Sequence, residues 1–199
     1  RLCCSSRETP ENFEQYIDAV DQTGKTDKLH LTSLEQHWNS DYMKSVRLKL
    51  MAGEEIPQCA VCNDNLLSQS NYRQWFTGFL FTDKIDECFE KTDETGYTTM
   101  EPISFDYRVS NLCNYKCRMC GEQLSSTWEA EKRQHDHWTP ESQPFMIPEN
   151  KEIIQKFQKD VVEEEFWDSI CRGIVEEIYW VGGEPLMYDI HWRAMNRLA

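Results

Sequence analysis

The order of the predicted elements in the second half of the chain indicates an α/β fold built on a parallel sheet. A predicted strand leads into a loop with three cysteines, helical patterns follow, and a second predicted strand ends at a pair of glycines. A strand, a helical crossover and another strand form the unit from which parallel sheets and α/β barrels are built. We therefore expect a parallel sheet or an α/β barrel here.

Side-chain patterns identify these elements. Residues 103–109 (Ile-Ser-Phe-Asp-Tyr-Arg-Val) alternate in type, which predicts a strand. Residues 177–181 (Glu-Ile-Tyr-Trp-Val) form a short apolar run that ends at glycine, a residue typical of turns. The run Ser126-Thr-Trp-Glu129 matches a capping box at the start of a helix. Residues 151–171 carry apolar side chains at helical spacing, namely Ile154, Phe157, Val161 and Ile170.

The sequence predicts two domains, over residues 1–97 and 98–199. The first is expected to be a small α+β domain, and its clearest element is a helix that ends at Gly53 and Pro57. Apolar side chains recur along this helix at four-residue spacing, at Trp38, Tyr42, Val46 and Leu50. The second domain reaches Ala199 with about two strands of a sheet, so we expect the start of a β/α barrel that is cut short.

Composition limits the kinds of partner. The chain has 35 acidic and 21 basic residues and a net charge of −14, which argues against nucleic-acid binding, since that depends on phosphate neutralisation by Lys and Arg. No apolar run approaches the ~20 residues needed to span a bilayer, so no membrane partner is expected.

The chain contains nine cysteines, and most of them are clustered like metal ligands. The clusters are Cys3-Cys4, Cys59-x2-Cys62 and Cys113-x3-Cys117-x2-Cys120. In a secreted protein an odd number would leave one thiol unpaired. In a reducing cytosol the same clusters indicate metal or iron–sulfur sites, so we expect a cytoplasmic protein.

The densest cluster is Cys113, Cys117 and Cys120. Three thiols at this spacing can hold three corners of a 4Fe–4S cluster, which usually takes four cysteinates, and this leaves one iron for an outside ligand. The alternative is a zinc site with Cys171 or a histidine as fourth ligand, although structural zinc normally uses paired two-ligand knuckles.

A second motif, Gly182-Gly183-Glu184-Pro185, begins 62 residues after Cys120 and directly follows the second predicted strand. The glycines permit positive φ and a close backbone approach to a small ligand. The carboxylate of Glu184 can accept hydrogen bonds from an ammonium group. An ordinary strand-ending turn is the alternative interpretation.

Together the two motifs resemble those of radical S-adenosylmethionine (radical SAM) enzymes. The resemblance implies that Cys113, Cys117 and Cys120 hold a 4Fe–4S cluster whose open iron is chelated by SAM. It implies that Gly182–Glu184 bind the methionine amino group of SAM. The position of Met119 is often aromatic in this superfamily and packs near the adenine; a flexible methionine can serve there.

The amino-terminal cysteines, with the helix before Cys59, resemble a twitch or SPASM auxiliary domain. The resemblance implies that Cys59, Cys62 and one of Cys3 or Cys4 hold an auxiliary 4Fe–4S cluster. The family's further cysteine would precede Arg1, so we expect this second cluster to be incomplete in the chain as given. A zinc knuckle or free thiols are the alternatives.

The expected function is therefore that of a radical SAM oxidoreductase, which forms a 5′-deoxyadenosyl radical to modify a small molecule or a peptide. The family implies an electron donor such as flavodoxin or ferredoxin. The chain alone, with an unfinished barrel, is expected to be inactive. A zinc-stabilised interaction module without catalysis is the competing hypothesis.

Overall fold

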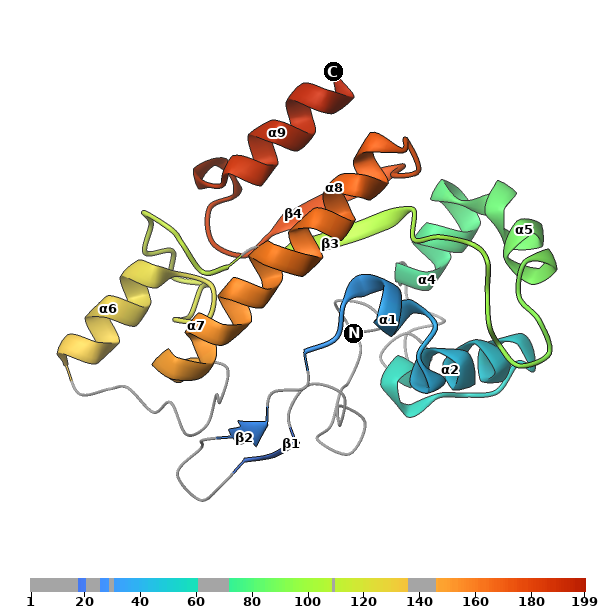
Figure 1. Ribbon diagram of the computed structural model, residues 1–199, viewed down its shortest axis with the longest axis horizontal. Helices are drawn as coiled ribbons and strands as arrows, with labels where there is room; N and C mark the ends of the chain where they lie inside the picture. Colours follow the sequence, from blue (N-terminus) through green and yellow to red (C-terminus); the bar gives the residue numbers. More distant parts are fainter. Residues whose placement is uncertain (1–17, 21–25, 29–30, 61–71, 109, 136–145) are drawn as a thin grey trace. The chain divides into compact units, whose positions relative to one another are not determined.

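The computed structural model describes residues 18–20, 26–28, 31–60, 72–108, 110–135 and 146–199 (Figure 1). The described residues belong to two compact units. The first unit contains 35–60 and 72–102, and the second contains 18–20, 26–28, 31–34 and everything described from 103 onward.

The first unit is mostly helical. Helix α1 (Leu34–Trp38) contributes its last residues, and α2 (Asp41–Met51) follows after a short break. Shorter helical segments complete the unit. These are η1 (Pro57–Cys59), α4 (Tyr72–Trp75), the π-helical η2 (Phe76–Leu80), η3 (Thr82–Lys84) and α5 (Ile85–Glu90).

The helix predicted along Trp38, Tyr42, Val46 and Leu50 is present as two segments, because α1 ends at Trp38 and α2 begins at Asp41. The hydroxyl of Ser40 accepts the backbone N–H of Met43 at 3.3 Å and caps a new helix. The predicted apolar stripe is wrong at its carboxyl end, because Leu50 is 41% exposed while Met43 and Val46 are buried.

Asn39 accounts for the break between α1 and α2. Its side-chain amide donates to the carbonyl of Thr98 at 3.0 Å and accepts the N–H of Thr98 at 3.1 Å. The guanidinium of Arg47 donates to the same Asn39 side chain at 3.1 Å and stacks 4.7 Å from the ring centre of Trp38. These contacts join α2 to the turn that contains Gly96, whose carbonyl accepts from Arg47 at 3.1 Å.

The described part of the second unit contains two small sheets. Strands β1 (Asp18–Val20) and β2 (Thr26–Lys28) pair antiparallel, whereas β3 (Ser104–Arg108) and β4 (Glu177–Val181) pair parallel. Helix α6 (Ser126–Gln134) and a longer helical run lie between β3 and β4 in the sequence. That run consists of α7 (Pro148–Phe157), the π-helical η6 (Gln158–Val162) and α8 (Glu163–Cys171), and it forms one rod in Figure 1.

One face of the β3/β4 pair is buried against α8. The ring of Phe166, which is fully buried, lies 5.1 Å from that of Phe105 and 4.2 Å from that of Tyr107. Helix α9 (Asp189–Leu198) adds Ile190 and Ala194 to the same core. The strand residues between these inward side chains lie on the opposite face of the pair.

The predicted strands and their parallel pairing are confirmed, and β4 has the predicted bounds. The barrel, and the division into an auxiliary domain over 1–97 and a barrel over 98–199, stay predictions. No helix in the described ranges has the length and apolar character required to cross a membrane.

Candidate functional site

The parallel register brings the two sequence motifs to the same edge of the sheet. Arg108, the last residue of β3, is the register partner of Val181, the last residue of β4. The three-cysteine loop follows the first strand and the glycine turn follows the second. Because the carboxyl ends of parallel strands meet at one edge, motifs that begin 69 residues apart, at 113 and 182, leave the sheet side by side.

The turn and the loop are joined through the carbonyl of Leu112, the residue before Cys113. The backbone N–H of Glu184 donates to this carbonyl at 2.8 Å, and the hydroxyl of Tyr188 donates to it at 3.2 Å. The hydroxyl of Ser110 lies 3.1 Å from that of Tyr188. The glycine turn therefore contacts the loop at the peptide that leads into its first thiol.

Both glycines of the turn have positive φ, +79° at Gly182 and +63° at Gly183. A Cβ at Gly183 would lie 2.2 Å from the Leu112 carbonyl oxygen and 2.6 Å from the Tyr188 hydroxyl. Real Cβ atoms do not approach so closely, and the left-handed backbone region disfavours other residues. Gly183 is therefore required by the contact between the turn and the loop.

Glu184 begins the short 3-10 turn η7 (Pro185–Met187). One carboxylate oxygen accepts the N–H of Leu186 at 3.2 Å. A carboxylate has about four acceptor positions, so this bond leaves acceptor capacity for a ligand. The expected role for Glu184 toward an ammonium group stays a prediction.

The three thiols of the loop are free of disulfides, with Cys113 and Cys120 partly buried and Cys117 exposed. The backbone N–H of Tyr115 donates to the sulfur of Cys113 at 3.3 Å. The pKa of the Cys120 thiol is raised, first by burial and then by the neighbouring Cys117 and Cys113.

Within the described ranges, no three His, Cys, Asp or Glu side chains form a group that could hold a metal ion. A single ion requires ligands that converge on one point, whereas a cubane receives each cysteinate at a different iron. A cubane therefore needs separate thiols around the volume that the cluster fills. By residue type, the three thiols of the loop are the donors that a cubane takes, and the N–H of Tyr115 is directed at one of them, but the described structure does not gather the three around one point.

A buried polar network lies at the base of the loop. The carboxylate of Glu129 in α6 accepts from the amide of Asn111 and the ammonium of Lys151, each at 2.6 Å, and from Arg133 at 2.8 Å. Burial alone raises the pKa of Glu129, but these three donors outweigh it and hold the pKa below its ordinary value. Lys151 also donates to the Asn111 side chain at 3.0 Å.

The sequence did not predict this network, and the capping box at Ser126 and Glu129 is wrong. The cap of α6 is Ser125, whose hydroxyl accepts the N–H of Trp128 at 3.4 Å. Glu129 instead points into the unit, where its partner lies 22 residues later at Lys151. An acidic residue followed by a lysine at that distance carries no recognisable signal.

The structure also describes Met119, Cys59 and Cys171 from the sequence-based predictions. Met119 is 91% exposed, and Cys59 is partly buried in the first unit. Cys171, the alternative zinc ligand, is exposed at the end of α8. Three predicted ligands of the auxiliary cluster lie outside the described residues, namely Cys3, Cys4 and Cys62.

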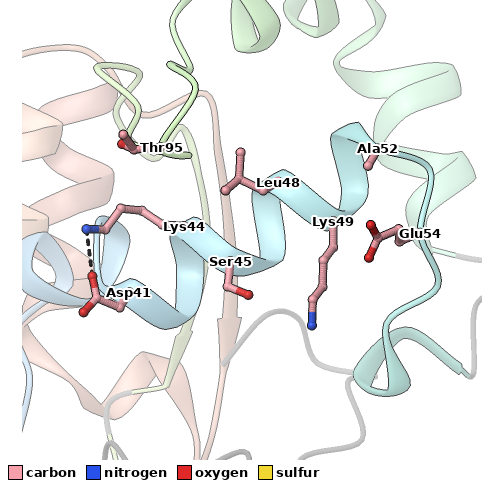
Figure 2. Close-up of a pocket in the computed structure, with 8 residues that line it drawn as sticks. All are labelled: Asp41, Lys44, Ser45, Leu48, Lys49, Ala52, Glu54 and Thr95. Atoms are coloured by element: carbon pink, nitrogen blue, oxygen red, sulfur yellow. Dashed lines mark ion pairs between the residues drawn. The ribbon is translucent and has the colours of Figure 1, made fainter.

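A separate depression of about 550 Å³ lies beside α2 in the first unit (Figure 2). Lys44 and Asp41 at its edge form an ion pair at 2.8 Å, and Lys49 and Glu54 add one charge of each sign. None of the site residues predicted from the sequence lines it.

Comparison of the chain with protein-family models, with curated proteins and with solved structures gave no match.

Proposed function

We propose that the chain is part of a radical SAM enzyme whose cluster and SAM sites lie at the carboxyl edge of β3 and β4. The observation that carries the proposal is the hydrogen bond from the Glu184 N–H to the Leu112 carbonyl at 2.8 Å. It joins a three-thiol loop to a Gly-Gly-Glu turn, and neither motif alone is specific. A ligand that binds both the three-cysteine loop and the Gly-Gly-Glu turn requires the two motifs to lie together, as this hydrogen bond indicates.

In this proposal Cys113, Cys117 and Cys120 hold a 4Fe–4S cluster. When bound, the cluster supplies one electron for cleavage of SAM to methionine and a 5′-deoxyadenosyl radical. The Tyr115 N–H stabilises the charge on the Cys113 sulfur, because hydrogen bonds to the sulfurs tune such clusters. The open acceptor positions of Glu184 receive the SAM ammonium group, and Met119 contacts the adenine.

The finer features of the proposal come from the same resemblance. They are an auxiliary cluster at Cys59 and Cys62 with Cys3 or Cys4, a flavodoxin or ferredoxin as electron donor, and a small molecule or peptide as substrate. The proposed compartment is the cytoplasm, where thiols stay reduced.

The test is the iron, acid-labile sulfide and zinc content after anaerobic purification and reconstitution. We expect a triple Cys113/Cys117/Cys120→Ala variant to lose about four irons with matching sulfide relative to the parent chain. A Cys171→Ala variant is the matched control and should lose none. Zinc without sulfide, lost in both variants, would refute the proposal and establish the zinc module instead.

A further inference from the structure

The backbone of the three-cysteine loop is held by the first turn of α6. Three alternate carbonyls of the loop accept hydrogen bonds from consecutive side chains at the start of this helix. Ser126 donates to Cys113 at 3.2 Å, Ser125 and Thr127 donate to Tyr115 at 2.7 and 2.6 Å, and the indole of Trp128 donates to Cys117 at 3.0 Å. None of these bonds uses a cysteine side chain.

Ser126 makes the most extensive of these contacts. Besides donating to the Cys113 carbonyl, its hydroxyl accepts the Cys113 N–H at 3.1 Å. Its own backbone N–H donates to the carbonyl of Asn111 at 2.6 Å. One serine therefore holds the peptide groups on both sides of the first thiol and the residue two positions earlier.

The helix that makes these contacts is itself fixed in place. Glu129, one turn further along α6, is buried and binds both Asn111 at the start of the loop and Lys151 in α7. The ion pair between Lys132 and Glu122 at 2.7 Å links α6 to the end of the loop. The helix can therefore act as a rigid support for the loop.

We propose that the first turn of α6 fixes the backbone of the three-cysteine loop before any cluster is bound. Ser126 and Trp128 are the positioning residues, acting through the backbone of Cys113 and Cys117. This inference rests on the proposed function in naming the ligand, but the ordering of the loop is independent of it. Fixing the loop beforehand lowers the ordering cost of binding, and removing such supports typically weakens metal binding 10- to 100-fold.

The first experiment measures amide hydrogen exchange in the metal-free full chain. The N–H groups of Cys113 and Cys120, which donate to the Ser126 hydroxyl and the Cys117 carbonyl, should be protected. Ser126→Ala should increase exchange at Cys113 by at least about 10-fold, and Ser126→Thr, which keeps the hydroxyl, should restore protection. Unprotected loop amides in the parent chain overturn the inference whatever the cofactor proves to be.

The second experiment measures the rate of iron loss to a chelator and the electron paramagnetic resonance spectrum after reconstitution and reduction. Trp128→Phe keeps an aromatic ring but removes the indole N–H donor, and we expect about 10-fold faster iron loss and shifted g values. Trp192→Phe is the matched control, because its indole donates to the Leu186 carbonyl at 2.9 Å and not to the loop.

These outcomes separate the inference from the proposed function. Suppose that the parent chain binds iron and sulfide and that Trp128→Phe has the same rate of iron loss and the same spectrum. This result overturns the positioning role of Trp128 and leaves the proposed function intact. A parent chain without sulfide overturns the proposed function, and loop protection in hydrogen exchange then still decides whether α6 orders the loop. Unfolding midpoints measured for each variant show whether the second unit remains folded.

Discussion

Replacing Gly183 by alanine tests the contact between the turn and the loop most directly. At φ +63°, the new Cβ would lie 2.2 Å from the Leu112 carbonyl oxygen, so the turn must move by at least about 1.2 Å to reach ordinary contact distance. That movement breaks the bonds that Leu112 accepts from Glu184 and Tyr188. We therefore expect Gly183→Ala to destabilise the second unit and to displace the loop.

The magnitude can be worked out against Gly173→Ala as a control. Gly173 has φ +73° and nothing within 4 Å of a Cβ, so alanine there meets only the left-handed backbone penalty of about 1–2 kcal/mol. Both variants also restrict the unfolded chain equally. The excess cost at Gly183 is therefore that of two lost hydrogen bonds, about 1 kcal/mol each.

The assay is urea unfolding of both variants followed by circular dichroism. With an m value of about 2 kcal/mol per molar urea, an excess of about 2 kcal/mol lowers the midpoint of Gly183→Ala by about 1 M relative to Gly173→Ala. Equal midpoints for the two variants would show that the turn does not press against the loop, and the argument for a joined site would fail.

Three further predictions concern the polar contacts. Glu129→Gln should make the stability of the chain less dependent on pH in the acid range. The wild-type carboxylate has a lowered pKa, so it stabilises the fold above its ordinary pKa of 4.5, and this contribution is lost as pH falls through the folded pKa. The difference between the urea midpoints at pH 7 and pH 3.5 should therefore be smaller in the variant. Tyr188→Phe removes one donor to the loop carbonyl and should cost about 1 kcal/mol by the same assay, with Tyr179→Phe as an exposed control. Asn39→Ala leaves both backbone groups of buried Thr98 without this side-chain partner and should cost about 2 kcal/mol in thermal unfolding.

The elements that the sequence predicted well are those specified by local pattern. Alternation over 103–109 and the apolar run over 177–181 each depend on neighbouring residues alone, and the helical run between them favours a parallel crossover. The sequence did not predict the register, which places the cysteine loop and the glycine turn at one edge of the sheet. It predicted the need for glycine, but not the Leu112 carbonyl that imposes it.

The features that the sequence missed depend on partners distant in the chain. The break at Asn39 comes from Thr98, 59 residues later, and the burial of Glu129 comes from Lys151. A helical stripe and a capping box are local hypotheses, so tertiary hydrogen bonds override them without any signal in the surrounding residues. The same limit applies to α6, whose Ser-Ser-Thr-Trp start has the composition of an ordinary helix amino terminus.

The contacts that shape the three-cysteine loop leave its thiols almost unused. From one side the turn holds the carbonyl of Leu112, and from the other α6 holds the carbonyls of Cys113 and Cys117. At the first thiol, the sulfur of Cys113 accepts the Tyr115 N–H at 3.3 Å, whereas the carbonyls carry the contacts with the turn and with α6. Replacing all three cysteines by alanine should therefore leave the backbone of the loop in place, because the bonds that define it remain. Any loss of iron in the triple variant then reports on the missing ligands and not on a collapsed loop, which makes that variant a clean test of the proposed function.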